Sequence, residues 1–253
     1  MPVTKSPHVI EPGIEQQQPS YGGRGPHDKL PTGGGGDDEQ WGERPEGRRG
    51  PRERLTKYRI GVFLGLSAIG MFFVALASTY FFRQGSGHID SLTGDWIRDW
   101  RPIVPPRILW LNTAIILGAS AALELARRAV FHPTDTVEEW LGLGYRTGRR
   151  TIPALLLGLL CGLGFLFGQY RAWLELKAQG AYYGVSAHFF AIFTAAHAAH
   201  LLLGIAALLL TLFAVLRHAR LENRQILIDS TAWYWHGMAI IWIGLFAVIW
   251  WAR

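Results

Sequence analysis

Histidines inside long apolar segments are the side chains of this chain with the clearest potential for chemistry. His197 and His200 are three residues apart, so on a helix their imidazoles share one face. Two such imidazoles can ligate a metal ion, but a usable site needs a third protein ligand, and no acidic residue or cysteine within the apolar segments is obviously placed to supply it. A haem held by two histidines would have to pair one of them with His236, which lies at a different depth. We therefore expect hydrogen bonds between helices, with haem ligation as the alternative.

Glu124 is an acidic side chain that could transfer protons, but its neighbours indicate a structural role. It precedes Arg127 and Arg128 by three and four residues, which on a helix puts both guanidinium groups beside the carboxylate. We expect an ion pair at the membrane interface rather than a proton-transfer group. No Walker loop, dinucleotide fingerprint, nucleophile elbow or zinc-protease motif occurs, and the lone Cys161 excludes a disulfide framework within the chain. The sequence thus predicts no catalytic residue.

Five apolar segments must position these side chains, and each is close to or longer than the ~20 residues that span the hydrocarbon core of a bilayer. They lie at about 60–82, 108–126, 152–170, 187–216 and 231–252. Residues 1–55 hold many glycines and prolines and almost no aliphatic residues, so we expect a disordered tail there. The predicted fold class is all-α: a polytopic transmembrane bundle of five helices, formed by residues 56–253, behind that tail.

The net charge of +6 is better explained by membrane topology than by a nucleic-acid partner. Lys and Arg residues gather at the ends of the apolar segments, with an excess on the side of the amino terminus. Because the cytoplasmic side of membrane proteins carries this excess, we expect a cytoplasmic amino terminus and a periplasmic carboxyl terminus. We expect no nucleic acid to bind.

Glycines in the third segment indicate how the helices pack. Small residues four apart let helix backbones approach closely in lipid. Gly158 and Gly162 lie on one face of this helix, and Gly164 and Gly168 lie well away from it. The spacing predicts that the third helix contacts neighbours on two sides and is central in the bundle.

Motifs in four of the five segments occur in an order typical of one family. In the last segment the motif is an aromatic run with a histidine and a later tryptophan: Trp233, Tyr234, Trp235, His236 and Trp242. The earlier segments contribute Asn112, Thr113 and Ser120, then Gln169 and Trp173, then His197, His200 and Gly204. In these residues the chain resembles subunit III of the haem-copper respiratory oxidases, cytochrome c or quinol oxidases, over about residues 60–252.

The resemblance implies a five-helix, non-catalytic subunit in the aerobic electron transport of a bacterial inner membrane. It implies docking on catalytic subunit I beside other oxidase subunits, with haem and copper in that partner, no cofactor or metal in this chain, and structural phospholipid between the helices. Acidic residues that the family usually has in its spans fall here at Ala68, Ala172 and Ala239. A role in proton uptake through such acids therefore transfers poorly.

Other functions stay open at this point. A relative of subunit III attached to nitric oxide reductases would share the same motifs. A small membrane haem b protein would use His197 or His200 with His236. A transporter is disfavoured, because the sequence has no inverted repeat and little charge within its spans.

Overall fold

The computed structural model describes residues 51–98, 100, 104–133, 137, 141–142, 146–179 and 184–251. The tail predicted to be disordered, residues 1–55, lies outside this part of the chain except at its end, where residues 51–55 form the first turns of a helix. Charged side chains there suit a helix, and Lys57 Nζ pairs with Glu53 at 2.8 Å across one turn.

Five long helices make up nearly all of the described residues, as predicted. Each is long and apolar enough to cross a membrane. The helices are α1 (Pro51–Gln84), α2 (Ile108–Val130), α4 (Arg146–Ala178), α5 (Val185–Leu216) and α6 (Leu221–Trp251). Most are longer than the apolar segments that predicted them, because polar residues at their ends continue the helical hydrogen bonding.

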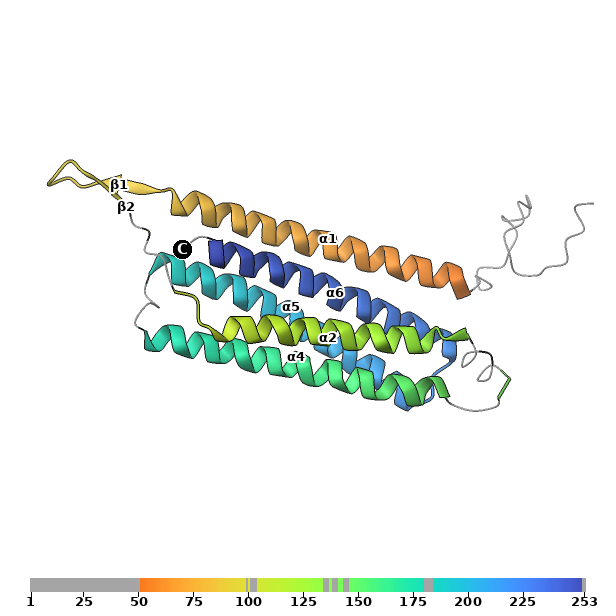
Figure 1. The fold of residues 1–253 in the computed structure, drawn as a ribbon. Coiled ribbons are helices and arrows are strands. Elements are labelled where there is room, and N and C mark those ends of the chain that lie inside the picture. Colours follow the sequence, from red (N-terminus) through yellow and green to blue (C-terminus); the bar gives the residue numbers. More distant parts are fainter. Residues whose placement is uncertain are drawn as a thin grey trace, which may run out of the picture. The chain divides into compact units, whose positions relative to one another are not determined.

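A small hairpin between α1 and α2 was not predicted. Its strands β1 (Gly87–Ile89) and β2 (Trp96–Arg98) pair antiparallel, with Ile89 opposite Trp96. Figure 1 shows it projecting beyond the ends of the helices, at the end of the bundle where α1 stops. Three residues per strand are too few to show the alternation of apolar and polar residues that identifies a strand in a sequence.

Helices α5 and α6 each pack on three others in the bundle: α6 on α1, α2 and α5, and α5 on α1, α4 and α6. The third predicted segment, α4, packs most closely on α2 and also on α5, so it has neighbours on two sides but is not the centre of the bundle. The glycine pattern reports close approach, whereas the number of neighbours depends on where the other helices lie.

Helix α1 is the least buried of the five spans. Only 6% of its most apolar window is buried, against 33–39% for the other four. A Cβ added at Gly61 or Gly65 would meet no atom within 4 Å, so these two glycines face open space.

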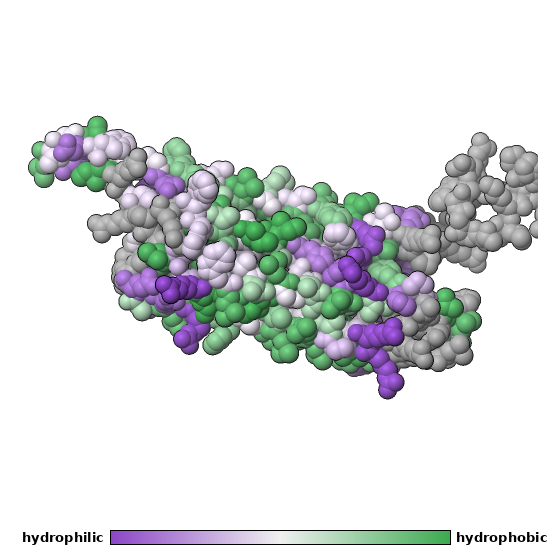
Figure 2. Space-filling model, viewed as in Figure 1, coloured by the Kyte–Doolittle hydropathy of each residue, from purple (hydrophilic) through white to green (hydrophobic). Residues whose placement is uncertain are grey.

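Apolar side chains dominate the middle of the face drawn in Figure 2, and polar side chains gather toward its ends. Such a surface suits contact with hydrocarbon or with apolar protein surfaces.

Candidate functional site

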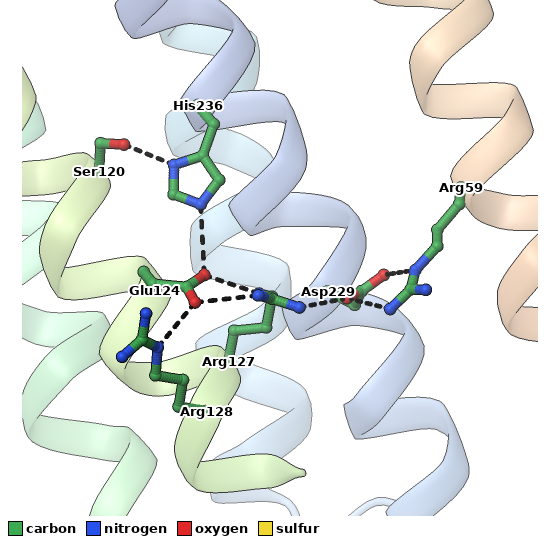
Figure 3. A network of polar contacts seen from close by, with 7 residues as sticks. All are labelled: Arg59, Ser120, Glu124, Arg127, Arg128, Asp229 and His236. Carbon is green, nitrogen blue, oxygen red and sulfur yellow. Dashed lines mark hydrogen bonds and ion pairs between the residues drawn. The ribbon is translucent and has the colours of Figure 1, made fainter.

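A network of charged side chains joins α1, α2 and α6 near one end of the bundle (Figure 3). Its most enclosed member is Asp229 of α6, whose side chain is fully buried. Arg59 of α1 binds this carboxylate with two hydrogen bonds, from Nε to Oδ2 at 2.6 Å and from Nη2 to Oδ1 at 2.9 Å. A guanidinium that binds both carboxylate oxygens fixes orientation as well as distance. The pair therefore sets how α1 sits on α6.

Arg127 of α2 links this pair to a second carboxylate. Its Nη1 lies 3.6 Å from Asp229 Oδ1, while its Nε and Nη2 donate to Glu124 at 2.7 and 2.9 Å. Arg128 Nε also donates to Glu124, at 2.9 Å. The ion pair predicted between Glu124 and the two arginines is thus confirmed, and it extends to α6 through Arg127.

His236 of α6 completes the network on the side away from Arg59. Its Nδ1 hydrogen-bonds with the hydroxyl of Ser120, and its Nε2 lies 3.5 Å from Glu124 Oε2. Ser120 and Glu124 thus share the face of α2 that contacts α6. Both ring nitrogens of His236 face side chains of this chain.

The charges in this network favour a structural role over proton transfer. Three guanidinium groups face two carboxylates, so each acid has a cation beside it. Arg127 stands between Asp229 and Glu124, and a guanidinium stays protonated in proteins. A proton therefore has no acceptor between the two acids, and the network acts as a clamp on three helices.

Sequence reasoning missed Arg59 and Asp229 as site residues. Asp229 lies two residues before the predicted start of the last span at 231, and Arg59 was counted only as a topology signal. Although the resemblance implies acids at the positions of Ala68, Ala172 and Ala239, the spans keep one buried carboxylate, that of Asp229. A signal was present, because Asp229 is followed within a few residues by the aromatic run of the last helix.

Trp233, the first tryptophan of the aromatic run, packs beside the charged network. The guanidinium of Arg127 lies 5.7 Å from the centre of its ring system, and Phe63 of α1 contacts the ring at 5.1 Å. The ring therefore bridges α1 and α2 across α6, and it shields one side of the ion pairs.

A second polar layer lies between α2, α4, α5 and α6, closer to the end where α2 begins. Asn112 Nδ2 donates to Gln169 Oε1 at 3.5 Å, and Trp242 Nε1 donates to the hydroxyl of Thr113 at 3.0 Å. Trp173 Nε1 donates to Thr194 Oγ1 at 2.8 Å. These bonds join α2 to α4, α2 to α6 and α4 to α5. The layer is made largely of residues that the sequence motifs singled out.

Close approach of α4, α5 and α6 depends on glycine. Tyr234 donates its hydroxyl to the carbonyl of His200 at 2.7 Å, and Trp235 Nε1 donates to the carbonyl of Gly204 at 3.2 Å. A Cβ at Gly204 would lie 2.9 Å from the ring of Tyr234, and one at Gly162 would lie 2.5 Å from the ring of Trp235. Only glycine fits these contacts without movement of a neighbour.

Gly158, Gly164 and Gly168 of α4 face α2. A Cβ at Gly158 would come within 3.1 Å of Leu123, and one at Gly168 would collide with the side-chain oxygen of Asn112. Gly164 is less crowded, since its nearest neighbour from α2 would be 3.9 Å away. The two predicted glycine faces thus do not correspond to two partner helices, because α2 reaches both.

Among the described residues, the imidazoles of His197 and His200 form none of the predicted hydrogen bonds between helices. His197 is fully buried, and its two ring nitrogens have no hydrogen-bond partner among the described residues. Its ring is enclosed by aromatic rings, among them Phe165 at 5.6 Å and Trp242 at 5.2 Å between ring centres. His200 Nδ1 donates to the carbonyl of Ala196 in its own helix at 2.7 Å. Packing, rather than polar contact, holds His197.

Comparison with known proteins identifies the family. The family model of cytochrome c oxidase subunit III matches residues 53–253. The chain belongs to the cytochrome c oxidase subunit III family. Cytochrome c oxidase subunit 3 of Heterololigo bleekeri and that of Gallus gallus are each 26% identical over 194 residues, which are 76% of this chain and 69% of the relative. The protein from Aedes aegypti is 27% identical over 150 residues, 59% of this chain and 52% of that relative.

As a member of the subunit III family, the chain is a subunit of an oxidase complex. His197 and His236, two histidines of the haem alternative, are both enclosed by side chains of this chain. His197 is surrounded by rings on several sides, and both nitrogens of His236 are engaged by Ser120 and Glu124. In the described part of the chain, no group of three His, Cys, Asp or Glu side chains could hold a metal ion.

Proposed function

We propose that this chain is the non-catalytic subunit III of a haem-copper terminal oxidase. In this role it supports assembly of the complex, binds structural phospholipid and stabilises the catalytic subunit during turnover. Haem and copper belong to the partner, catalytic subunit I, and this chain holds no redox centre. The complex works in aerobic electron transport in a bacterial inner membrane.

The observation that carries this proposal is how the polar side chains in the spans are used. Asp229, Glu124 and the three arginines compensate one another, and Trp242 and Trp173 donate hydrogen bonds to hydroxyl groups of neighbouring helices. These groups are used to join helices. A subunit that positions other components needs a rigid bundle of this kind, and family membership supports the same role.

Orientation in the membrane follows from the charges. The tail and the Arg59 end of α1 lie in the cytoplasm, because basic residues in excess mark the cytoplasmic side. The hairpin end of α1 then faces the periplasm, as does the carboxyl terminus. Accessibility of single cysteines introduced at Ser86 and Glu222 to a membrane-impermeant thiol reagent, in a Cys161→Ser background, tests this orientation. Labelling of Glu222→Cys alone in intact cells would reverse it.

Affinity purification of the tagged chain in a mild detergent tests the proposed partner. We expect a haem-copper catalytic subunit in stoichiometric amount, identified by its absorption spectrum and by mass spectrometry. Recovery of the chain alone in several detergents would contradict the proposal. Recovery of a nitric oxide reductase would instead support the alternative named above, a relative of subunit III attached to that enzyme.

The purified chain without its partner separates the subunit from a small haem b protein. We expect no stoichiometric haem band in its absorption spectrum, because His197 is enclosed and His236 is engaged at both nitrogens. A haem band at one haem per chain, lost on His236→Ala, would establish the cytochrome instead.

A further inference from the structure

The hairpin of β1 and β2 lies outside the hydrocarbon region. Helix α1 has 34 residues and is therefore about 51 Å long at 1.5 Å per residue. A bilayer core is only about 30 Å thick. The hairpin continues from α1 past the ends of the other helices (Figure 1). Its surroundings are therefore aqueous or belong to another protein.

Three large apolar side chains at and beside the turn of this hairpin are exposed, among polar residues. Leu92 in the turn is 92% exposed, and Ile89 and Trp96 are 66% and 60% exposed. Ile89 and Trp96 are opposite each other in the two strands, so their side chains lie on one face. The Trp96 ring lies over Gly87, where a Cβ would come within 2.9 Å of it. Ile89, Leu92 and Trp96 are therefore apolar side chains that the described part of the chain leaves largely uncovered.

The turn is held in one conformation by its own hydrogen bonds. Asp90 donates its backbone N–H to the carbonyl of Asp95 at 2.9 Å and accepts at Oδ1 from the N–H of Leu92 at 3.0 Å. Gly94, with φ of 74°, donates to the carbonyl of Asp90 at 2.9 Å. Leu92 is thus presented outward by an ordered turn. An isolated hairpin of two strands is at best marginally stable in water, so a partner surface would stabilise it.

The chain after the hairpin is attached to the bundle. Trp100 packs edge-on against Tyr80 of α1 at 4.8 Å and against Phe189 of α5 at 6.3 Å between ring centres. The hairpin is therefore fixed at its base, while the apolar tip extends beyond the contacts of its own chain. A fixed base limits the entropy lost when the tip binds a partner.

We propose that the hairpin docks into an apolar groove on the water-exposed part of another subunit of the oxidase complex. The charges favour a basic protein surface, because Asp90 and Asp95 lie in the turn beside Leu92, whereas Arg98, the basic residue of β2, lies at the far end of that strand. The matching groove has Lys or Arg residues at its rim. This proposal rests on the proposed function, since the occupant is a subunit of that complex.

A photo-crosslinking amino acid placed at Leu92 of the full, tagged chain tests this docking. The complex is purified in mild detergent, irradiated and separated, and the crosslinked peptide is identified by mass spectrometry. We expect a crosslink to a soluble segment of another subunit. Adducts to lipid or detergent alone, or no crosslink, would overturn the proposal. Leu203 of α5, an exposed apolar residue within a span, serves as the control position, which should not react with that soluble segment.

A second variant measures what the contact contributes. Leu92→Ser combined with Trp96→Ser removes two of the three exposed apolar side chains but keeps Asp90 and Gly94, which hold the turn. We expect the recovery of the partner subunit to fall at least threefold in raised detergent, whereas Leu203→Ser leaves recovery unchanged. Unchanged recovery with the hairpin variant would contradict the inference while the proposed function stands. If the unmodified chain brings down no oxidase subunit, both the proposed function and the docking proposal fail.

Discussion

Replacing Asp229 by Asn tests whether the buried ion pair holds α1 on α6. The change keeps the size of the side chain but leaves the guanidinium of Arg59 without a carboxylate. Breaking a buried ion pair by removing one partner costs about 3–5 kcal/mol. Arg59 is 37% exposed and can turn toward water, so we expect the lower end of this range, about 3 kcal/mol. Arg127 loses less, because it still binds Glu124 with two hydrogen bonds.

The measurement is the free energy of unfolding of the purified chain in mixed micelles, from titration with a denaturing detergent followed by circular dichroism. Glu222→Gln is the matched control, since its ion pair with Arg54 at 3.5 Å joins the same two helices but both side chains are partly exposed. We expect that control to cost less than about 1 kcal/mol.

A double variant decides whether the two residues act as a pair. Arg59→Met alone leaves the fully buried carboxylate of Asp229 with only Arg127, at 3.6 Å. Combined with Asp229→Leu, it removes both charges and leaves apolar side chains of similar size. We expect this double variant to lose less stability than the sum of the losses for Arg59→Met alone and Asp229→Leu alone. The reasoning is refuted if the losses in the free energy of unfolding are additive, or if Asp229→Asn costs no more than Glu222→Gln. In either case the ion pair of Arg59 and Asp229 would not hold α1 on α6.

The packing of the bundle yields two further predictions, both measured as the free energy of unfolding in the same assay. Gly162→Ala should cost about 1–3 kcal/mol, because the new methyl group meets the ring of the buried Trp235. Gly65→Ala, on open surface, should be neutral or stabilising by up to about 1 kcal/mol, and equal losses at the two glycines would contradict the contact. His197→Phe should leave stability within about 1 kcal/mol of the original, because neither ring nitrogen has a partner in the described chain. A loss above about 3 kcal/mol would show that His197 has a polar partner.

The five spans could be predicted from the sequence because a bilayer allows few solutions. A segment that crosses hydrocarbon must satisfy its own backbone, so an apolar run of about 20 residues is nearly always a helix. The ends were less well defined, as the additional helical residues of α1 and α4 show. Polar residues such as Arg59 and Arg150 continue the helix once water or headgroups replace hydrocarbon.

The contacts between helices were only partly predictable. Glu124, Arg127 and Arg128 lie on one helix, where the spacing along the sequence determines which side chains are in contact. Arg59 and Asp229 are 170 residues apart, and no periodicity within either helix shows that they meet. For His197 the sequence showed a polar residue in an apolar span, but its aromatic enclosure comes from three other helices.

The pairing of Arg59 with Asp229 also bears on the order of events during synthesis. During synthesis α1 leaves the ribosome before α6. The guanidinium of Arg59 therefore cannot bind the carboxylate of Asp229 until α6 enters the bilayer. Until then Arg59 stays among the headgroups and water, and α1, which has little other packing, remains loosely seated. The seating of α1 on the bundle is therefore completed only when α6 has entered the bilayer.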